Sequence, residues 1–345
     1  MADPTMRKHN AFSKSFRSRV IWVYALLASC TIAAWATAVV AFGSDVILLG
    51  TAFLAFSLGL RHGVDADHIA AIDNVTRKLM HEGKHPLCVG LFFALGHSSV
   101  VILASFVVFV TASALDHQLI GLKAISEIIG TSISALFLIA IALINLRILQ
   151  GIYRSFKRVE ETGACPTDLD LSHGGLLTRL FEPIIRLLSR SWHMYPLGFI
   201  FGLGFETATE VALFGISATA AGKGLSISSM MVFPLLFTAG MTLVDTTDGI
   251  LMVGAYGWAF VKPIRKLYYN MTITLISVIV ALVVGGVEAV DLLRDQLGLT
   301  GGIWELVGSL NEHLGALGFI IIAIFVVSWV GSMLVYRLTG YRQLE

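Results

Sequence analysis

The chain has 345 residues, of which 56% are hydrophobic and only 14% are charged. Soluble proteins carry roughly 25% charged residues, and one compact core cannot hide this many apolar side chains, so the composition excludes a soluble enzyme. The 24 lysines and arginines nearly balance the 23 aspartates and glutamates, which gives no electrostatic reason to expect a nucleic-acid partner.

The predicted elements are apolar segments long enough to cross a bilayer as helices, which takes about 20 residues at about 1.5 Å each. Eight such segments predict an all-α integral membrane protein with eight transmembrane helices. In chain order they run over residues 20–42, 46–74, 87–111, 124–150, 196–221, 228–260, 267–288 and 313–336. The first is too long for the core of a signal peptide, and a second apolar segment follows it directly, so we interpret it as a retained helix.

Basic residues predict how these helices are oriented, because lysine and arginine remain on the cytoplasmic side of a membrane. Of the 24 lysines and arginines, 20 lie on one side. They precede the first helix, follow the last, or lie in the loops after helices two, four and six, with Arg147 in the last turn of helix four. The opposite side has only Lys123, Lys223 and Arg294, and Arg61 lies inside the second helix. This alternation predicts that both termini are cytoplasmic, since one missed helix would reverse every later loop.

The whole chain, residues 1–345, is predicted to form a single polytopic membrane domain. Its parts are a cytoplasmic N-terminus (1–19), helices one to four (20–150), a long cytoplasmic loop (151–195), helices five to eight (196–336) and a cytoplasmic tail (337–345). The loop links two groups of four helices that share only faint sequence similarity. Its apolar patch either lies along the membrane surface as an amphipathic helix or belongs to a solvated linker.

The second predicted helix contains LGLRHGVDADHIAAIDN, whose polar side chains are costly in hydrocarbon. Each charge at mid-membrane costs about 2.5 to 3.5 kcal/mol on insertion scales, so several charges in one helix require compensation. At about 100° per residue His62, Asp65 and His68 form one stripe, whereas Asp67 falls about 140° from His62. Either Gly63 permits a break in the helix, or Asp67 has a separate partner on a neighbouring helix.

Three later helices add polar side chains to the membrane region. GHSS in the third contributes His97, GFETATE in the fifth contributes Glu206 and Glu210, and GMTLVDTTD in the sixth contributes Asp245 and Asp248. Imidazole and carboxylate without thiolate suit nickel, cobalt and zinc, and the three scattered cysteines form no CxxC pair. The same groups also suit a proton relay, and the two functions can coexist. For His97 taken alone, a hydrogen-bonded packing role is the alternative.

Asp73, near the end of the second helix, has a different interpretation. It lies four residues before Arg77, close to the predicted cytoplasmic boundary. This spacing predicts an ion pair in the interfacial region.

These motifs together resemble the four signatures of the nickel/cobalt transporter family of membrane permeases. They are RHGVDADHI at 61–69, LGHSSVV at 95–101, LGFETATE at 203–210 and GMTLVDTTD at 240–248. The resemblance implies an eight-helix permease, not an enzyme, that imports Ni²⁺, Co²⁺ or both at high affinity. The expected partners are the divalent metal ion and the lipid bilayer, with no cofactor. The basic N-terminus and the lack of a secretory signal suit a bacterial inner membrane.

Carried over residue by residue, the resemblance marks a set of membrane side chains that recognise the metal, and the two glutamates of the fifth helix extend it. The predicted metal site is His62, Asp65, Asp67, His68, His97, Glu206, Glu210, Asp245 and Asp248. We expect His62 and His68 to bind as neutral imidazoles with Asp65 as the first carboxylate, while the later acids complete the path or carry protons. The sequence departs from the family pattern at Gly63, commonly alanine, and at Glu206, commonly aspartate.

Two other functions compete with import. Efflux permeases related to this family carry a histidine-rich cytoplasmic loop, whereas the predicted loop here has only His173 and His193. A membrane metalloenzyme would need several HxxxH, HxxHH or HExxH boxes, and the predicted helices contain none. The chain also has no GxxxxGK[ST] loop, so it is not expected to hydrolyse ATP itself.

Overall fold

The computed structural model describes residues 4–112, 118–162, 188–204, 208–259, 263–312, 318–324, 326–327 and 331. Over these residues the chain is helical and contains no strand, as the sequence predicts. The helices are α1 (Pro4–Phe42), α2 (Val46–His62), α3 (Ala66–His81), α4 (Val89–Ala112), α5 (Gln118–Thr162), α7 (Met194–Phe201), α8 (Ala208–Gly222), α9 (Ile227–Met230), α10 (Val232–Ala259), α11 (Pro263–Leu297) and α12 (Ile303–Glu312), with the 3-10 helices η1 (Ser191–His193) and η2 (Gly202–Gly204).

Five helical stretches of the described residues are long and apolar enough to cross a membrane by themselves. They are Phe16–Phe42, Val89–Val110, Thr131–Gly151, Ile227–Ala255 and Thr274–Leu297. Two bent pairs, α2 with α3 and η1–η2 with α8, raise the number to seven if each pair is one span. These seven correspond in order to the first seven predicted helices. The eighth predicted helix, 313–336, falls largely outside the described residues and stays a prediction.

The second span is broken where its polar residues lie. α2 ends at His62, α3 begins at Ala66, and the two axes differ by 51°. Of the two alternatives that the sequence left open, the break beside Gly63 is confirmed. The reason for glycine is space and not backbone freedom, because Gly63 has an ordinary helical φ of −62° and a Cβ there would lie 2.8 Å from the Cβ of Val244 on α10.

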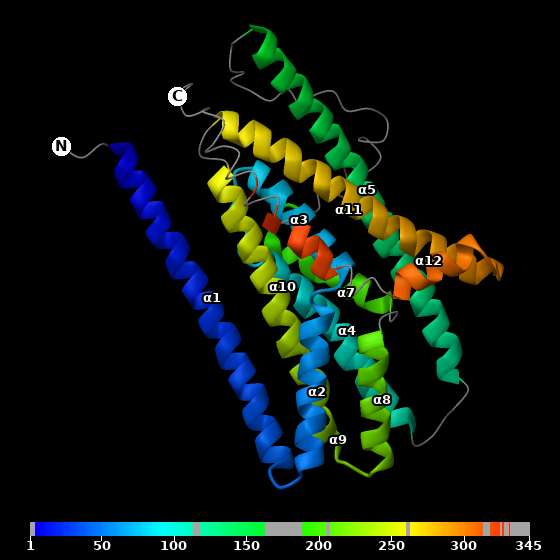
Figure 1. Cartoon of the computed structure of the whole chain (residues 1–345). Helices are drawn as coiled ribbons and strands as arrows, with labels where there is room; N and C mark the ends of the chain where they lie inside the picture. The colour runs from blue at the N-terminus through cyan, green and yellow to red at the C-terminus, as the bar shows by residue number, and fades with distance from the viewer. Residues whose placement is uncertain are drawn as a thin grey trace.

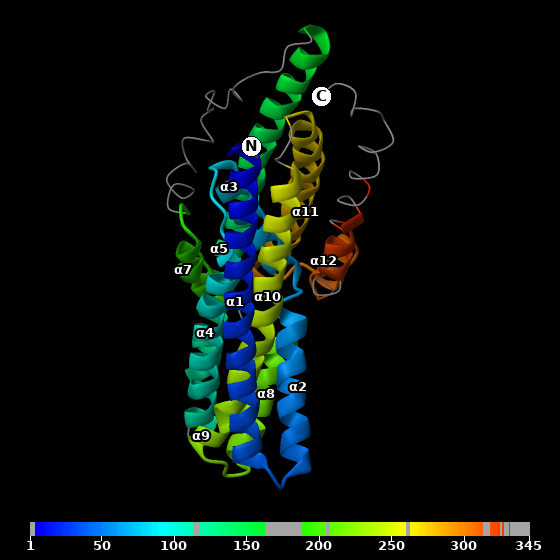
Figure 2. The same cartoon turned by 90° about the vertical axis from the view of Figure 1, so that its left-hand side faces the viewer.

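One helix, α10, packs against most of the others around the break. It contacts α1, α2, α3 and α4, and both views show it running between them (Figure 1 and Figure 2). α11 packs along α5 on the other side of the molecule. We call the end at which α1 begins and α3, α5 and α10 end the basic end, since Arg17, Arg19 and Lys78 lie there. It is the predicted cytoplasmic end.

The apolar core has two parts that meet at the broken span. One part lies toward the basic end and includes Ile69, Val75 and Phe93. The other lies toward the opposite end and includes Ala55 and Phe237. The polar residues at the break therefore lie between two apolar cores, which shield them from bulk water.

The described ends of two segments differ from the predicted boundaries. α5 continues to Thr162, well past residue 151, where the cytoplasmic loop is predicted to begin, and most of that loop lies outside the described residues. α12 forms in the predicted outer loop, where Asn311 donates a hydrogen bond to Asp291 of α11 at 2.7 Å. The first residue of the segment 318–324, Gly318, approaches the carbonyl oxygen of Val64 so closely that a Cβ would overlap it. This segment therefore packs directly on the break.

Glycines on the central helices permit the close approach of backbones, as is common between membrane helices. A Cβ at Gly90 of α4 would overlap the backbone carbonyl of Asp245 on α10. We expect Gly90→Ala to lower the free energy of unfolding by about 1 to 3 kcal/mol, since the two helices must separate. The measurement is the unfolding temperature of the purified protein in detergent.

Gly254→Ala is the matched control, because Gly254 lies on α10 and a Cβ there meets no atom of the described residues within 4 Å. Its effect should be neutral or stabilising by up to about 1 kcal/mol, since alanine is the better helix former. Equal unfolding temperatures for the two variants would contradict the packing described here.

Candidate metal site

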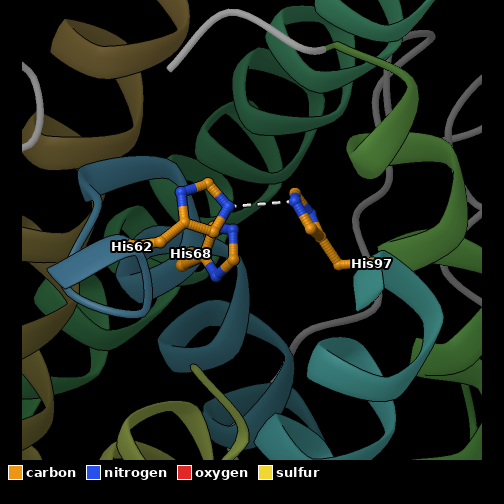
Figure 3. A group of neighbouring side chains, drawn as sticks. All are labelled: His62, His68 and His97. Carbon is orange, nitrogen blue, oxygen red and sulfur yellow. Dashed lines mark hydrogen bonds between the residues drawn. The ribbon is translucent and has the colours of Figure 1, made fainter. Parts of the chain in front are cut away.

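Three buried histidines from three helices lie side by side at the break (Figure 3). His62 is the last residue of α2, His68 is in the first turn of α3, and His97 lies in α4; their exposed fractions are 1%, 0% and 3%. One nitrogen of each ring lies within 4.8 Å of one nitrogen of both others. The sequence places two of these rings on one stripe, and the fold brings the third to them.

The break gives Asp65 an unusual position. Asp65 is the residue before the first turn of α3, with extended φ and ψ of −64° and 145°, where an aspartate normally accepts backbone N–H groups of the helix. Its side chain makes no such hydrogen bond. Instead Oδ2 lies 2.8 Å from Nδ1 of His62, and Oδ1 lies 3.5 Å from Nη1 of Arg61. The carboxylate thus orients the histidine and not the helix end.

Carboxylates fix which nitrogen of two rings carries the proton. A carboxylate only accepts hydrogen bonds, so Nδ1 of His62 donates to Asp65, and the lone pair is on Nε2. In the same way Nδ1 of His68 donates to Asp245 of α10 at 3.1 Å. Nε2 of His68 is buried and has no hydrogen-bond partner among the described residues. Carboxylate–histidine pairs of this kind are typical of the residues that orient metal ligands.

The third ring completes the cluster with a glutamate. Nε2 of His97 lies 2.9 Å from Nε2 of His62 and 3.0 Å from Oε1 of Glu210, and the same oxygen lies 3.9 Å from Nε2 of His62. Two nitrogen ligands at right angles on one metal ion, each about 2.0 to 2.1 Å from it, are about 2.9 Å apart. The spacing of these two nitrogens therefore suits adjacent ligands of a single ion.

Two aromatic rings and one hydroxyl border the cluster. The ring of Phe93 lies edge-on to His68 with centroids 4.9 Å apart, and the ring of Phe237 lies 5.4 Å from His62. Thr209 places its hydroxyl 3.1 Å from Nδ1 of His62. Neither phenylalanine is among the residues predicted from the sequence, although Phe93 precedes His97 by four residues and so shares its helix face. Apolar walls strengthen every electrostatic interaction inside them.

The structure brings together only part of the predicted site. His62, Asp65, His68, His97, Glu210 and Asp245 are in hydrogen-bond contact as one group. Asp67 is half-buried and interacts electrostatically with His62 and His68, with no hydrogen bond to any described residue. Asp248 lies one turn beyond Asp245, away from the rings. Glu206 lies outside the described residues.

The predicted ion pair of Asp73 with Arg77 forms, but not at the protein surface. Oδ2 of Asp73 lies 3.8 Å from Nη2 of Arg77, and their side chains are 0% and 1% exposed. Both are enclosed by α3 and the helices around it. A spacing of four residues predicts the pair but carries no information on which neighbouring helix covers it.

The protein family described as "High-affinity nickel-transport protein" matches residues 48–335 of this chain. The chain is 57% identical over 332 residues to the "High-affinity nickel transport protein" of Cupriavidus necator, covering 95% of each. It is 50% identical over 337 residues to the "Hydrogenase nickel incorporation protein HupN" of Bradyrhizobium diazoefficiens, covering 95% of this chain and 88% of the relative. It is 40% identical over 300 residues to the "Cobalt transport protein NhlF" of Rhodococcus rhodochrous, covering 86% of this chain and 85% of the relative. No solved structure matches the chain.

Binding of a metal ion to the three rings should stabilise the folded protein. A ligand at about 100 times its Kd adds about 2.7 kcal/mol to the free energy of unfolding. We expect Ni²⁺ to raise the unfolding temperature of the purified protein, and the rise to disappear in His97→Ala. The control is His85→Ala, an exposed loop histidine outside the cluster, which should keep the full rise. An equal rise in all three proteins would mean that Ni²⁺ binds elsewhere.

Proposed function

The chain belongs to the high-affinity nickel-transport protein family, and we propose that it imports Ni²⁺ across a bacterial inner membrane through the histidine cluster. The single observation that carries the proposal is the convergence of His62, His68 and His97 in an apolar region at the broken second span. Burying three imidazoles beside three carboxylates has no evident structural benefit. A Lewis acid held between them would give each lone pair a partner.

We assign Nε2 of His62, His68 and His97 as metal ligands, with Oε1 of Glu210 as the oxygen ligand. By the rule used for the other two rings, Nε2 of His97 donates to Glu210 in this structure. Metal binding must therefore displace this proton, since ligands bind in their deprotonated form. Imidazole nitrogens suit nickel and cobalt, which accept nitrogen and oxygen donors in tetragonal or octahedral arrangements. The carboxylate of Glu210 lowers the net charge of the bound ion. In this assignment Asp65 is not a ligand, in contrast to its first rank in the sequence analysis, because its Oδ2 accepts from His62.

Cobalt is proposed as a second substrate. The relative from Rhodococcus rhodochrous, 40% identical to this chain, bears the name of a cobalt transport protein. Ni²⁺ and Co²⁺ have the same charge and use the same imidazole and carboxylate donors. The cluster therefore offers no charge-based discrimination between them, and any preference depends on coordination geometry.

The proposal includes the topology predicted from the basic residues. An eight-helix arrangement with both termini and the long loop in the cytoplasm would place the basic end inside the cell. The metal would then enter from the opposite end, lose water at the break, and leave toward α3 and α10. Transport of this kind is not an enzymatic reaction, and the family is a family of transporters.

Uptake of trace radioactive nickel tests the assignment directly. His62→Ala, His68→Ala and His97→Ala should each abolish uptake by cells, because each removes a nitrogen ligand, while the protein remains in the membrane fraction. His85→Ala should transport normally. Normal uptake by any one of the three would remove that residue from the site. Cells expressing the intact protein should become more nickel-sensitive, whereas greater resistance would indicate efflux.

The orienting role of Asp245 predicts a graded effect. An asparagine at this position can still accept a hydrogen bond from Nδ1 of His68, whereas an alanine cannot. Loss of such a partner typically costs about 10- to 100-fold in metal affinity. We expect Asp245→Ala to raise the apparent KM for nickel by this factor and Asp245→Asn to raise it less. Equal loss in both variants would indicate that the negative charge of Asp245, and not its hydrogen bond, is required.

A further inference from the structure

A second buried polar cluster lies beyond the histidines, toward the basic end. It consists of Asp73, Asn74 and Arg77 of α3, Asn145 of α5, Asp248 of α10 and Ser277 of α11. All six side chains are at most 9% exposed. The proposed histidine site does not use any of them. Four helices thus enclose a group of charged and amide side chains, of which only Asp248 belongs to the metal site predicted from the sequence.

The carboxylates of this cluster continue from the histidine site in one direction. Asp245 bonds His68, and Asp248 lies three residues further along α10, about 4.5 Å along the axis. Asp73 lies five residues beyond His68 on α3, about 7.5 Å along that axis. Asp248 interacts electrostatically with both Asp245 and Asp73. In Figure 1 α3 and α10 both run toward the basic end. Asp245, Asp248 and Asp73 therefore follow one another toward that end, and we call these three carboxylates the file.

Two members of the cluster lack the partners that burial normally demands. Oδ2 of Asp248 is buried and has no hydrogen-bond partner among the described residues. The guanidinium of Arg77 donates from Nη2 to Asn74 at 2.6 Å, but its Nε and Nη1 are buried without a partner in the described part of the chain. An unsatisfied buried polar atom is costly, so such atoms mark a place where another group binds or where the side chain moves.

The donor atoms around Asp248 and Asp73 suit a cation. Ser277 donates its hydroxyl proton to Oδ2 of Asp73 at 2.6 Å and so places a third side-chain oxygen beside this carboxylate. All-oxygen donors bind divalent cations, but they hold nickel less firmly than imidazoles do. A weaker position after a tight one is what release requires, since an ion must bind well enough to enter and weakly enough to leave.

We propose that Asp248 and Asp73 form a second, oxygen-lined position for the transported divalent cation on the way to the basic end, and that Arg77 closes it in this structure. This inference rests on the proposed function, because it assumes that the metal leaves the histidines. Arg77 lies 3.8 Å from Asp73, so its charge neutralises one of the two carboxylates and repels an arriving cation. Asn145 donates a hydrogen bond to the side-chain oxygen of Asn74, which also accepts one from Arg77. Asn74 therefore connects Arg77 to α5.

The test counts Ni²⁺ bound to the purified full-length protein by equilibrium dialysis. The wild type should bind a single ion tightly, at the histidines. Arg77→Gln removes the competing charge and should bind two, the second more weakly, and adding Asp248→Asn to that variant should return the count to one. A single ion in Arg77→Gln, with unchanged affinity, would overturn the second position.

A histidine variant in the same background separates the two proposals. Arg77→Gln combined with His97→Ala should lose the tight ion and keep the weak one. If His97→Ala changes nothing in either background, the histidine site itself fails. If it removes the tight ion while Arg77→Gln never gains a second, the histidine site holds and the second position fails.

If Arg77→Gln does not reach the membrane, Asp248→Asn in the wild-type background gives the answer. It should keep Ni²⁺ bound at the histidines but lose uptake. The control is Glu288→Gln, a buried carboxylate of α11 bonded to Ser134 and away from the file, which should transport normally. Normal uptake by Asp248→Asn, or loss of binding together with uptake, would overturn the proposal.

Discussion

The hydrogen bond from Nδ1 of His62 to Asp65 spans the break at which α2 ends. In a continuous helix Asp65 would lie one turn above His62 with its backbone in the helical ladder. Here it occupies the position before a new helix, and the backbone at the break remains satisfied, since the amide of Asp65 donates to the carbonyl of His62 at 2.9 Å. At the break the Asp65 carboxylate orients the imidazole of His62. The backbone amide of Asp65 is also hydrogen-bonded, as a membrane environment requires.

A second bent span meets the first at the same place. Thr209 and Glu210 lie in the first turn of α8, just after the bend between η2 and α8, and both contact the imidazoles of the cluster. The straight helices α4 and α10 supply His97 and Asp245 between them. Broken helices that meet near the middle of a bundle are a recurring way to build an ion site at membrane depth. The present cluster has that construction, with two broken and two straight helices.

Much of this arrangement could be predicted from the sequence, and the failures have physical causes. Hydropathy predicts the apolar helices because each needs its own continuous apolar stretch. Helical periodicity places His62 and His68 on one stripe and shows that Asp67 cannot join them in a regular helix, which leads to the break. Spacing within one helix cannot show which atom a carboxylate faces, so Asp65 is ranked as a ligand although it orients His62. Contacts between distant segments, such as Glu210 with His97, depend on packing that no local pattern encodes.

The central claim is that imidazole nitrogens of His62, His68 and His97 hold the metal. X-ray absorption at the nickel edge of the purified, nickel-loaded protein tests it most directly, because imidazole rings add a distinctive outer-shell scattering. We expect nitrogen or oxygen ligands at about 2.0 to 2.1 Å, with outer-shell scattering from three imidazoles. His97→Ala, which loses the tight ion, should not give this spectrum. A spectrum with oxygen ligands alone, or one that His97→Ala leaves unchanged, would contradict it.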